Sequence, residues 1–153
     1  MSAPSLVYVT KIRTTAAKLW EALIQPEFVR QYWIGCHHES TWKEGDPVAC
    51  YSAEGAQKWH GEIMKNVPES ELVFSFNHVG MDEPASRVSF KIERADVDTM
   101  QLTITHDEFI EASPVRERVQ GGWPIIVKGI KELLETGKVA EQECSCEAAT
   151  ASR

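Results

Sequence analysis

Hydrophobic and polar residues alternate near the start of the chain, and the pattern then changes to helical spacing. Residues 6–13 alternate and are rich in β-branched side chains, which is typical of a β-strand. Thr14 or Thr15 can then serve as an N-cap, and Pro26 suits the first turn of a second short helix. The two helical stripes consist of Ala16, Leu19, Trp20, Leu23 and Ile24, and of Phe28, Val29, Tyr32 and Trp33. We therefore expect one strand followed by two short helices.

Alternation with a period of two returns repeatedly between residues 36 and 106. The segment Cys36–Trp42 is short and its pattern is ambiguous between a strand and a loop. Turn-forming residues such as those at 44–47 and 80–84 separate the segments, and short links favour an antiparallel meander. The clearer strands are expected at 48–52, 58–67, 72–77, 88–92 and 100–106.

The last patterned stretch predicts a long amphipathic helix that ends at Gly137, a credible C-terminal stop. Pro124 is tolerated in a first turn but costly deeper inside a helix, so we expect the helix to start at Gly121 or Gly122. A separate turn would then occupy residues 115–119, and the two glycines would let the helix entrance approach the sheet closely. The apolar stripe consists of Val119, Trp123, Ile126, Val127, Ile130, Leu133 and Leu134.

These elements predict one α+β domain at residues 5–137, followed by a disordered tail at 138–153. A chain of 153 residues is the size of one domain. An antiparallel sheet of about six or seven strands must bury one face, and only the last helix has a stripe long enough to cover it. The tail is rich in Ala, Ser, Thr and Glu and shows no periodicity.

Charge and composition narrow the classes of partner. The net charge of −7 and the pI near 5.2 argue against nucleic acid and against anionic membrane surfaces, which both attract basic patches. No secretory signal and no apolar stretch of about 20 residues is present, so we expect a soluble cytoplasmic protein.

The cysteines and histidines give little support for disulfides, metals or cofactors. In a cytoplasmic chain with a large core, Cys36 and Cys50 are expected to be ordinary small residues. Cys36-His37-His38-Glu39 offers metal-binding groups in a row, but adjacent histidines would point in different directions. We therefore expect no metal site and no cofactor.

The segment TTAAKLWEALIQPEFVRQYW, residues 14–33, resembles the helix pair of the START/polyketide-cyclase (SRPBCC) superfamily. More narrowly, the chain resembles homologues of the activator of the heat-shock-protein-90 ATPase over residues 5–137. Further matches are residues 44–46, Gly61-Glu62-Ile63, Pro68 with residues 72–74, His106, and Gly122-Trp123. One departure is Glu71, where the family often has an arginine.

This resemblance implies a helix-grip fold, in which a curved sheet and a long helix enclose a cavity. Many members bind apolar or amphipathic small molecules there, and some relatives in the wider superfamily are enzymes. The eukaryotic co-chaperone carries a further N-terminal domain, for which this chain has no room, so we do not expect a chaperone partner.

Apolar side chains expected on the inner faces are the candidates for a ligand pocket, although plain core packing is the ordinary role of any single aromatic residue. His106 and Glu108 are expected to continue the inward side of the last strand. His106 could orient a ligand or act as an acid or base, or it could make a structural hydrogen bond. The candidate ligand-binding residues are Trp33, Phe74, Phe76, Phe90, His106, Glu108, Trp123 and Val127.

The leading hypothesis is therefore non-catalytic binding of an apolar or amphipathic small molecule in an internal cavity. One alternative is a cyclase- or hydrolase-type enzyme that uses His106 with a carboxylate. Another is a chaperone-associated interaction module, which a large exposed apolar patch would favour. The sequence leaves open whether two copies form a homodimer.

Overall fold

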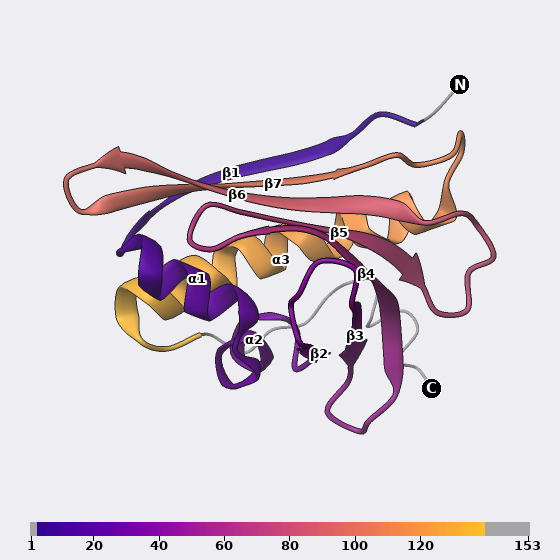
Figure 1. Cartoon of the computed structure of the whole chain (residues 1–153), viewed down its shortest axis with the longest axis horizontal. Coiled ribbons are helices and arrows are strands. Elements are labelled where there is room, and N and C mark those ends of the chain that lie inside the picture. Colours follow the sequence, from indigo (N-terminus) through magenta and orange to yellow (C-terminus); the bar gives the residue numbers. More distant parts are fainter. Residues whose placement is uncertain (1–2, 140–153) are drawn as a thin grey trace.

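The computed structural model describes residues 3–139 and shows a seven-stranded sheet that curves around a long helix (Figure 1). This confirms the expected α+β helix-grip class. The tail predicted at 138–153 lies outside the described residues from 140 onward. The elements are β1 Leu6–Arg13, α1 Ala16–Ile24, α2 Pro26–Tyr32, β2 His37–Ser40, β3 Pro47–Tyr51, β4 Gln57–Val67, β5 Glu71–His78, β6 Ser86–Asp96, β7 Thr99–Asp107 and α3 Pro114–Thr136.

The sheet has the order β1-β7-β6-β5-β4-β3-β2 and is antiparallel throughout. Strands β2 to β7 form the expected meander. The first strand pairs with the last, and the register runs from Leu6 opposite His106 to Arg13 opposite Thr99. This pairing brings the two ends of the domain together.

Helices α1 and α2 begin where the sequence predicts. The Thr15 hydroxyl accepts the backbone N–H of Lys18 at 3.2 Å and caps α1, and Pro26 occupies the first turn of α2. The buried Tyr32 hydroxyl donates to the carbonyl of Ala22 at 2.6 Å, which ties the end of α2 to α1. The two helices therefore pack as one unit at one end of the sheet (Figure 1).

The start of α3 differs from the sequence prediction. The helix is continuous from Pro114, so neither a separate turn at 115–119 nor a start at Gly121 or Gly122 is present. The Ser113 hydroxyl accepts the backbone N–H of Arg116 at 3.0 Å, and Pro114 takes the first helical position. The Glu83 carboxylate accepts the Val115 N–H at 3.1 Å and the Ser113 hydroxyl at 2.6 Å. A carboxylate about thirty residues earlier in the sequence thus completes this helix start.

Pro124 consequently lies inside α3, where a proline normally costs about 3 kcal/mol. Its position on the helix reduces that cost. Pro124 and Gln120, whose carbonyl loses its usual partner, are both exposed, so water can take the missing hydrogen bond. Caps at the start and buried residues on both sides of Pro124 stabilise the continuous helix.

Gly61 marks a close approach between β4 and β5. A Cβ atom at Gly61 would lie 1.8 Å from the carbonyl oxygen of Ser75, a distance that no side chain can tolerate. The Ser75 hydroxyl accepts the N–H of Glu62 at 2.9 Å beside it, and the pairing shifts register after Ile63. In Figure 1 the four neighbouring strands β1, β7, β6 and β5 run along the long axis, whereas β3 and the lower part of β4 turn away from it. Gly61 therefore lies where the sheet bends.

Side chains of α3 cover the open edge of β1. Lys131 donates from Nζ to the Lys11 carbonyl, and the Glu135 carboxylate accepts the N–H of Arg13 at 2.9 Å. Near the other end, Arg116 Nε donates to the carbonyl of Pro4 at 2.7 Å. Unpaired edge strands invite pairing with other chains, and these contacts occupy two free groups of β1 and one of the segment before it.

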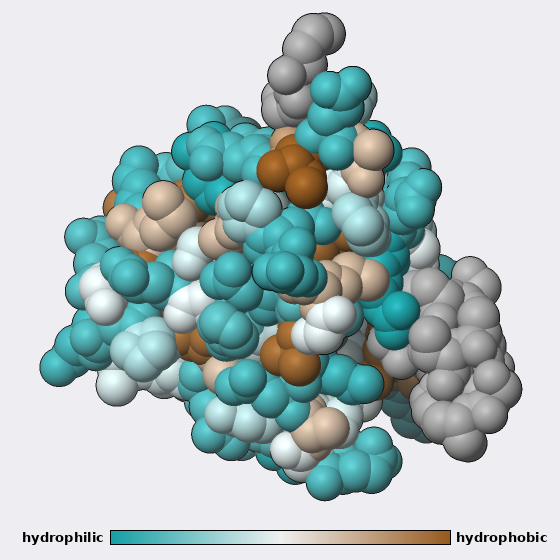
Figure 2. Space-filling view, turned by 90° about the vertical axis from the view of Figure 1, so that its right-hand side faces the viewer, coloured by the Kyte–Doolittle hydropathy of each residue, from teal (hydrophilic) through white to brown (hydrophobic). Residues whose placement is uncertain are grey.

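The exposed surface carries large hydrophobic side chains that are mostly isolated. Val7 and Val9 on β1 are more than half exposed and lie close together, whereas Met64, Val79 and Val97 come from separate segments. On the face shown in Figure 2, residues at the hydrophobic end of the scale are separated by hydrophilic ones. Isolated exposed hydrophobic residues are normal for a folded domain.

Candidate functional site

A layer of aromatic rings lies between the concave face of the sheet and α3. Of the eight candidate residues, six meet there. The ring centroids of Trp33 and Trp123 are 5.4 Å apart, and those of Phe74 and Phe90 are 5.7 Å apart. All six side chains are buried: Trp33, Phe74, Phe76, Phe90, His106 and Trp123.

The alternation of the strands explains this convergence. Phe74 and Phe76 are two residues apart on β5, and they share the inner face with Phe90 on β6 and His106 on β7. Trp123 reaches the layer from the buried side of α3. Trp33 caps the end of α2. The layer thus joins five elements of the fold.

His106 is the centre of a hydrogen-bonded chain inside this layer. The indole Nε1–H of Trp123 donates to His106 Nδ1 at 3.1 Å, so Nδ1 is unprotonated. Nε2 therefore carries the proton and donates to the Ser86 hydroxyl oxygen at 2.7 Å. That hydroxyl in turn donates to the carbonyl of Phe76 at 3.3 Å. Every polar group of this hydrogen-bonded network has a partner, although His106 is fully buried.

These hydrogen bonds fix His106 as a neutral imidazole. Burial lowers the pKa of His106 to about 3, while the nearby Asp107 raises it slightly. Protonation at Nδ1 would also bring two donors together at the Trp123 indole. The Asp107 carboxylate pairs with Arg87, at 3.0 Å to Nε and 2.8 Å to Nη2. The neighbouring carboxylate is therefore engaged with another side chain.

A second buried histidine lies at the other end of the layer, where the sequence had suggested no site. His38 on β2 and Trp59 on β4 both point inward, with ring centroids 5.0 Å apart at an edge-on angle. Neither His38 Nε2 nor Trp59 Nε1 has a hydrogen-bond partner within residues 3–139. Burial, and next the nearby His37, lower the pKa of His38 to about 3. The alternation of Cys36–Trp42 could have indicated that one of the two histidines faces inward.

The remaining two candidates lie away from the centre of the layer. Val127 is half-buried and packs against the edge of the core. The expectation that Glu108 faces inward is wrong, because β7 ends at Asp107 and Glu108 has a φ of 62°. This left-handed backbone turns the side chain out of the alternation, and its carboxylate pairs with Arg87 Nη1 at 3.2 Å on the surface.

The Cys36–Glu39 segment separates its side chains as expected. His37 lies near the surface and its Nε2 is 3.0 Å from the Glu39 carboxylate, whereas His38 is buried. Cys36 and Cys50 are free thiols, and the adjacent Cys36 together with burial raises the pKa of Cys50. In the described part of the chain, no three His, Cys, Asp or Glu side chains gather in a way that could hold a metal ion.

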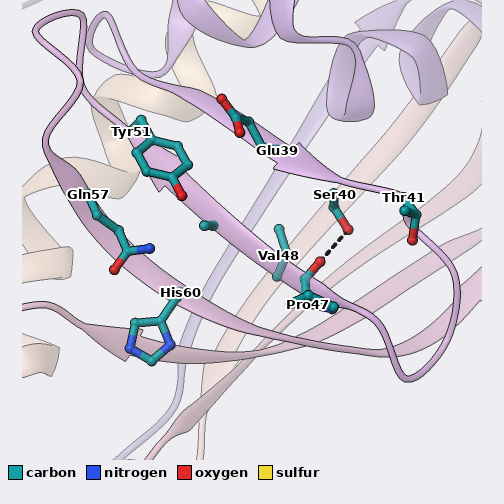
Figure 3. A pocket seen from close by; sticks show the side chains of 9 residues that line it. Glu39, Ser40, Thr41, Pro47, Val48, Tyr51, Gln57 and His60 are labelled. Carbon is teal, nitrogen blue, oxygen red and sulfur yellow. Dashed lines mark hydrogen bonds between the residues drawn. The ribbon is translucent and has the colours of Figure 1, made fainter.

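An open groove of about 690 Å³ lies on the opposite face of β2, β3 and β4. Figure 3 shows Glu39, Tyr51 and Gln57 around it, with the Ser40 hydroxyl hydrogen-bonded to the Pro47 carbonyl at 2.7 Å. None of the eight candidate residues lines this groove. Its open position on the surface contrasts with the buried aromatic layer.

Comparison with known proteins places the chain in a family. The family model described as Activator of Hsp90 ATPase homolog 1-like protein matches residues 13–135. No curated protein sequence matches the chain significantly. Within residues 3–139, no helix is long and apolar enough to cross a membrane.

Solved structures share the fold at low sequence identity. A protein of Mesorhizobium loti is 20% identical with a TM-score of 0.73, covering 86% of this chain and 96% of that one. The Aha1 dimer from Colwellia psychrerythraea is 15% identical with a TM-score of 0.70, covering 89% and 99%. An HSP90 activator from Plasmodium falciparum is 17% identical with a TM-score of 0.67, covering 79% and 88%. These likenesses concern the fold.

Proposed function

Because the chain belongs to the family of Activator of Hsp90 ATPase homolog 1-like proteins, within the START/polyketide-cyclase superfamily, we propose that it binds an uncharacterised small molecule without catalysing a reaction. The ligand is apolar or amphipathic and lies between the sheet and α3. The aromatic layer forms the wall on which it packs. Binding sites for such molecules are concave and lined mainly by hydrophobic and aromatic side chains.

The observation that carries the proposal is empty space at the buried side of α3. Gly122 is buried and lies within the same arc of the helix as Val115, Ile126 and Leu133. Apart from its chain neighbours and the adjacent helix backbone, a Cβ atom at Gly122 would nevertheless meet no atom within 4 Å. Protein interiors are close-packed, so a buried backbone without neighbours indicates a void. The adjacent residue, Trp123, belongs to the aromatic layer.

The geometry gives less support to an enzyme that uses His106 with a carboxylate. Both ring nitrogens of His106 are occupied, by Trp123 and by Ser86, and its low pKa disfavours the protonated form that a general acid needs. A general base requires a free nitrogen within reach of substrate. The arrangement instead suits a rigid wall that holds its aromatic rings in place.

The geometry also gives less support to a partner module. An interaction surface for another protein is usually a continuous apolar patch, and the exposed hydrophobic residues here are mostly isolated. Val7 and Val9 are the exception, and a second copy of the chain could cover them, since the Colwellia relative is a dimer. Such a dimer would leave the interior site unchanged.

The proposal can be tested by binding and by filling the void. Native mass spectrometry of the purified chain should show a co-purified small molecule, and a fluorescent hydrophobic dye should bind and be displaced by it. Gly122→Leu fills the void and should weaken dye binding at least tenfold without loss of folding, because the backbone there is helical and the space is open.

Lys128→Leu is the matched control. It introduces the same side chain into the same helix at an exposed position, so dye binding should stay unchanged. Equal dye affinity in Gly122→Leu and wild type would contradict the proposed site, as would failure of the wild type to bind any hydrophobic probe.

A further inference from the structure

We propose that His38 Nε2 and Trp59 Nε1 together recognise one uncharged oxygen, a hydroxyl or a carbonyl, on the ligand. This inference rests on the proposed function, because it concerns the polar end of the same interior site. It assigns a role to two side chains that are not among the eight candidate ligand-binding residues. The ligand is then a neutral, mainly apolar molecule with an oxygen at its buried end.

The fold places the two side chains opposite each other. His38 on β2 is paired with Cys50 on β3, and Cys50 is paired with Trp59 on β4, so the three residues form one row across the inner face. Cys50 in the middle is small. The curved sheet therefore lets the larger rings on both sides lean over it until their centroids are 5.0 Å apart.

Both nitrogens are buried without a partner, which is costly. His38 is 1% exposed and Trp59 is 3% exposed. An unpaired buried polar group has lost its hydrogen bonds to water without replacement, and such groups in native proteins usually have a partner such as water or a ligand. The indole of Trp59 approaches the Cys50 sulfur, but sulfur is a weak acceptor and the contact does not reach hydrogen-bond geometry.

One oxygen atom can satisfy both nitrogens. The Trp59 indole can only donate, whereas neutral His38 can donate or accept at Nε2, depending on its tautomer. A hydroxyl can accept from Trp59 and donate to His38, and a carbonyl can accept from both. A hydrocarbon would leave both nitrogens unpaired, so the site should discriminate against it.

The surroundings exclude a charged oxygen. The buried polar side chains of residues 3–139 are three serines and two histidines, with no lysine or arginine. A buried carboxylate without a cation is strongly unfavourable. The walls favour an apolar ring system, because Trp33 lies 4.3 Å from His38 between centroids and Phe74 stacks on Trp59 at 5.2 Å.

The test compares two probes that differ by one oxygen, 2-naphthol and naphthalene, by displacement of the bound dye. In the wild type we expect 2-naphthol to bind at least tenfold more tightly, beyond the difference in their partition from water. In His38→Phe and in Trp59→Phe this preference should fall below threefold, while the affinity for naphthalene stays within about threefold. His60→Phe makes the same change on the outer face of β4 and should retain the full preference.

A second measurement does not depend on the folding of the variants. The NMR signal of the Trp59 indole N–H should move downfield on addition of 2-naphthol to the wild type, because the N–H gains a hydrogen bond, whereas naphthalene should not produce this downfield shift. If both probes bind the wild type with no preference and the indole signal does not respond, the oxygen site is wrong while the binding function stands. If neither probe binds, both proposals fail.

Discussion

Two histidines are buried in the same aromatic layer, yet their surroundings differ at the two ends of the sheet. At the β6–β7 end, His106 has a donor on one nitrogen and an acceptor on the other. At the β2–β4 end, Nε2 of His38 lacks a partner within the described residues, as does the facing Trp59 N–H. The two histidines are thus equally buried, but both nitrogens of His106 are hydrogen-bonded and Nε2 of His38 is not. Hydrogen bonds hold the imidazole in place at the β6–β7 end, whereas unused hydrogen-bonding capacity is present at the β2–β4 end.

The largest effect should come from removing the indole that supports His106. Trp123→Ala should lower the free energy of unfolding by about 3–5 kcal/mol, because Trp123 is buried among other rings and donates to Nδ1. Dye binding should change as well, since the indole forms part of the wall. Urea unfolding and dye titration of the same sample measure both. A large stability loss with unchanged dye binding would leave Trp123 as core packing alone.

Replacing His106 itself should distinguish the two ends of the aromatic layer more sharply than replacing Trp123. His106→Phe keeps a ring of similar size but leaves the Trp123 N–H and the Ser86 hydroxyl without their partner. We expect a loss of about 2–4 kcal/mol in the free energy of unfolding, measured by urea denaturation. A loss below about 1 kcal/mol would show that the hydrogen-bonded chain contributes little.

Acid should act on both ends alike, because burial lowers both pKa values to about 3. An unfolded histidine has a pKa near 6.5, so the unfolded chain binds protons below that pH while the native chain does not. Stability should therefore fall between pH 6.5 and pH 3. The expected loss between pH 7.5 and pH 5 is about 2 kcal/mol for each histidine.

Urea unfolding across this pH range tests the expectation. His38→Phe and His106→Phe should each reduce the dependence of the free energy of unfolding on pH by the contribution of one histidine. A slope that is unchanged in both variants would assign the acid sensitivity to other groups.

The smallest change is expected for His38→Phe at pH 7.5. Removing an unpaired buried nitrogen and retaining the ring should alter the free energy of unfolding by less than about 1 kcal/mol, or raise it slightly. The same substitution thus costs several times more at His106 than at His38. Equal losses in the free energy of unfolding for His38→Phe and His106→Phe would contradict the difference between the two ends.

Periodic burial made most of the fold predictable from sequence. Strands such as β5 and β7 and the helix α1 each alternate or repeat in step with one buried face, and a local pattern suffices to recognise them. The start of α3 was not predictable in this way. Pro124 suggested a late start, whereas the deciding contact comes from Glu83, which no local pattern connects with Ser113.

The candidate site shows the same limit. Phe74, Phe76, Phe90 and Trp123 could be identified because aromatic residues on inner faces converge. The role of His106 depends on Ser86 and Trp123, which lie 20 residues before it and 17 after it in the sequence. The two orphan nitrogens depend on the curvature of the sheet over Cys50. Such properties arise from three-dimensional neighbours and leave no spacing in the sequence.

The pairing of β1 with β7 also has a consequence for biosynthesis. Their paired residues are 86 positions apart at Arg13 and Thr99, and 100 positions apart at Leu6 and His106. At a translation rate of roughly 5–20 residues per second, β1 waits roughly 5–20 s for its partner strand, and somewhat longer for α3 to cover its edge. Throughout that interval Leu6 and Ile12, which are buried in the folded domain, and the free backbone of β1 are exposed on the ribosome-bound chain. The domain should therefore close late, and a nascent chain arrested before residue 99 should aggregate or recruit a holdase, whereas one arrested well after residue 136 should not.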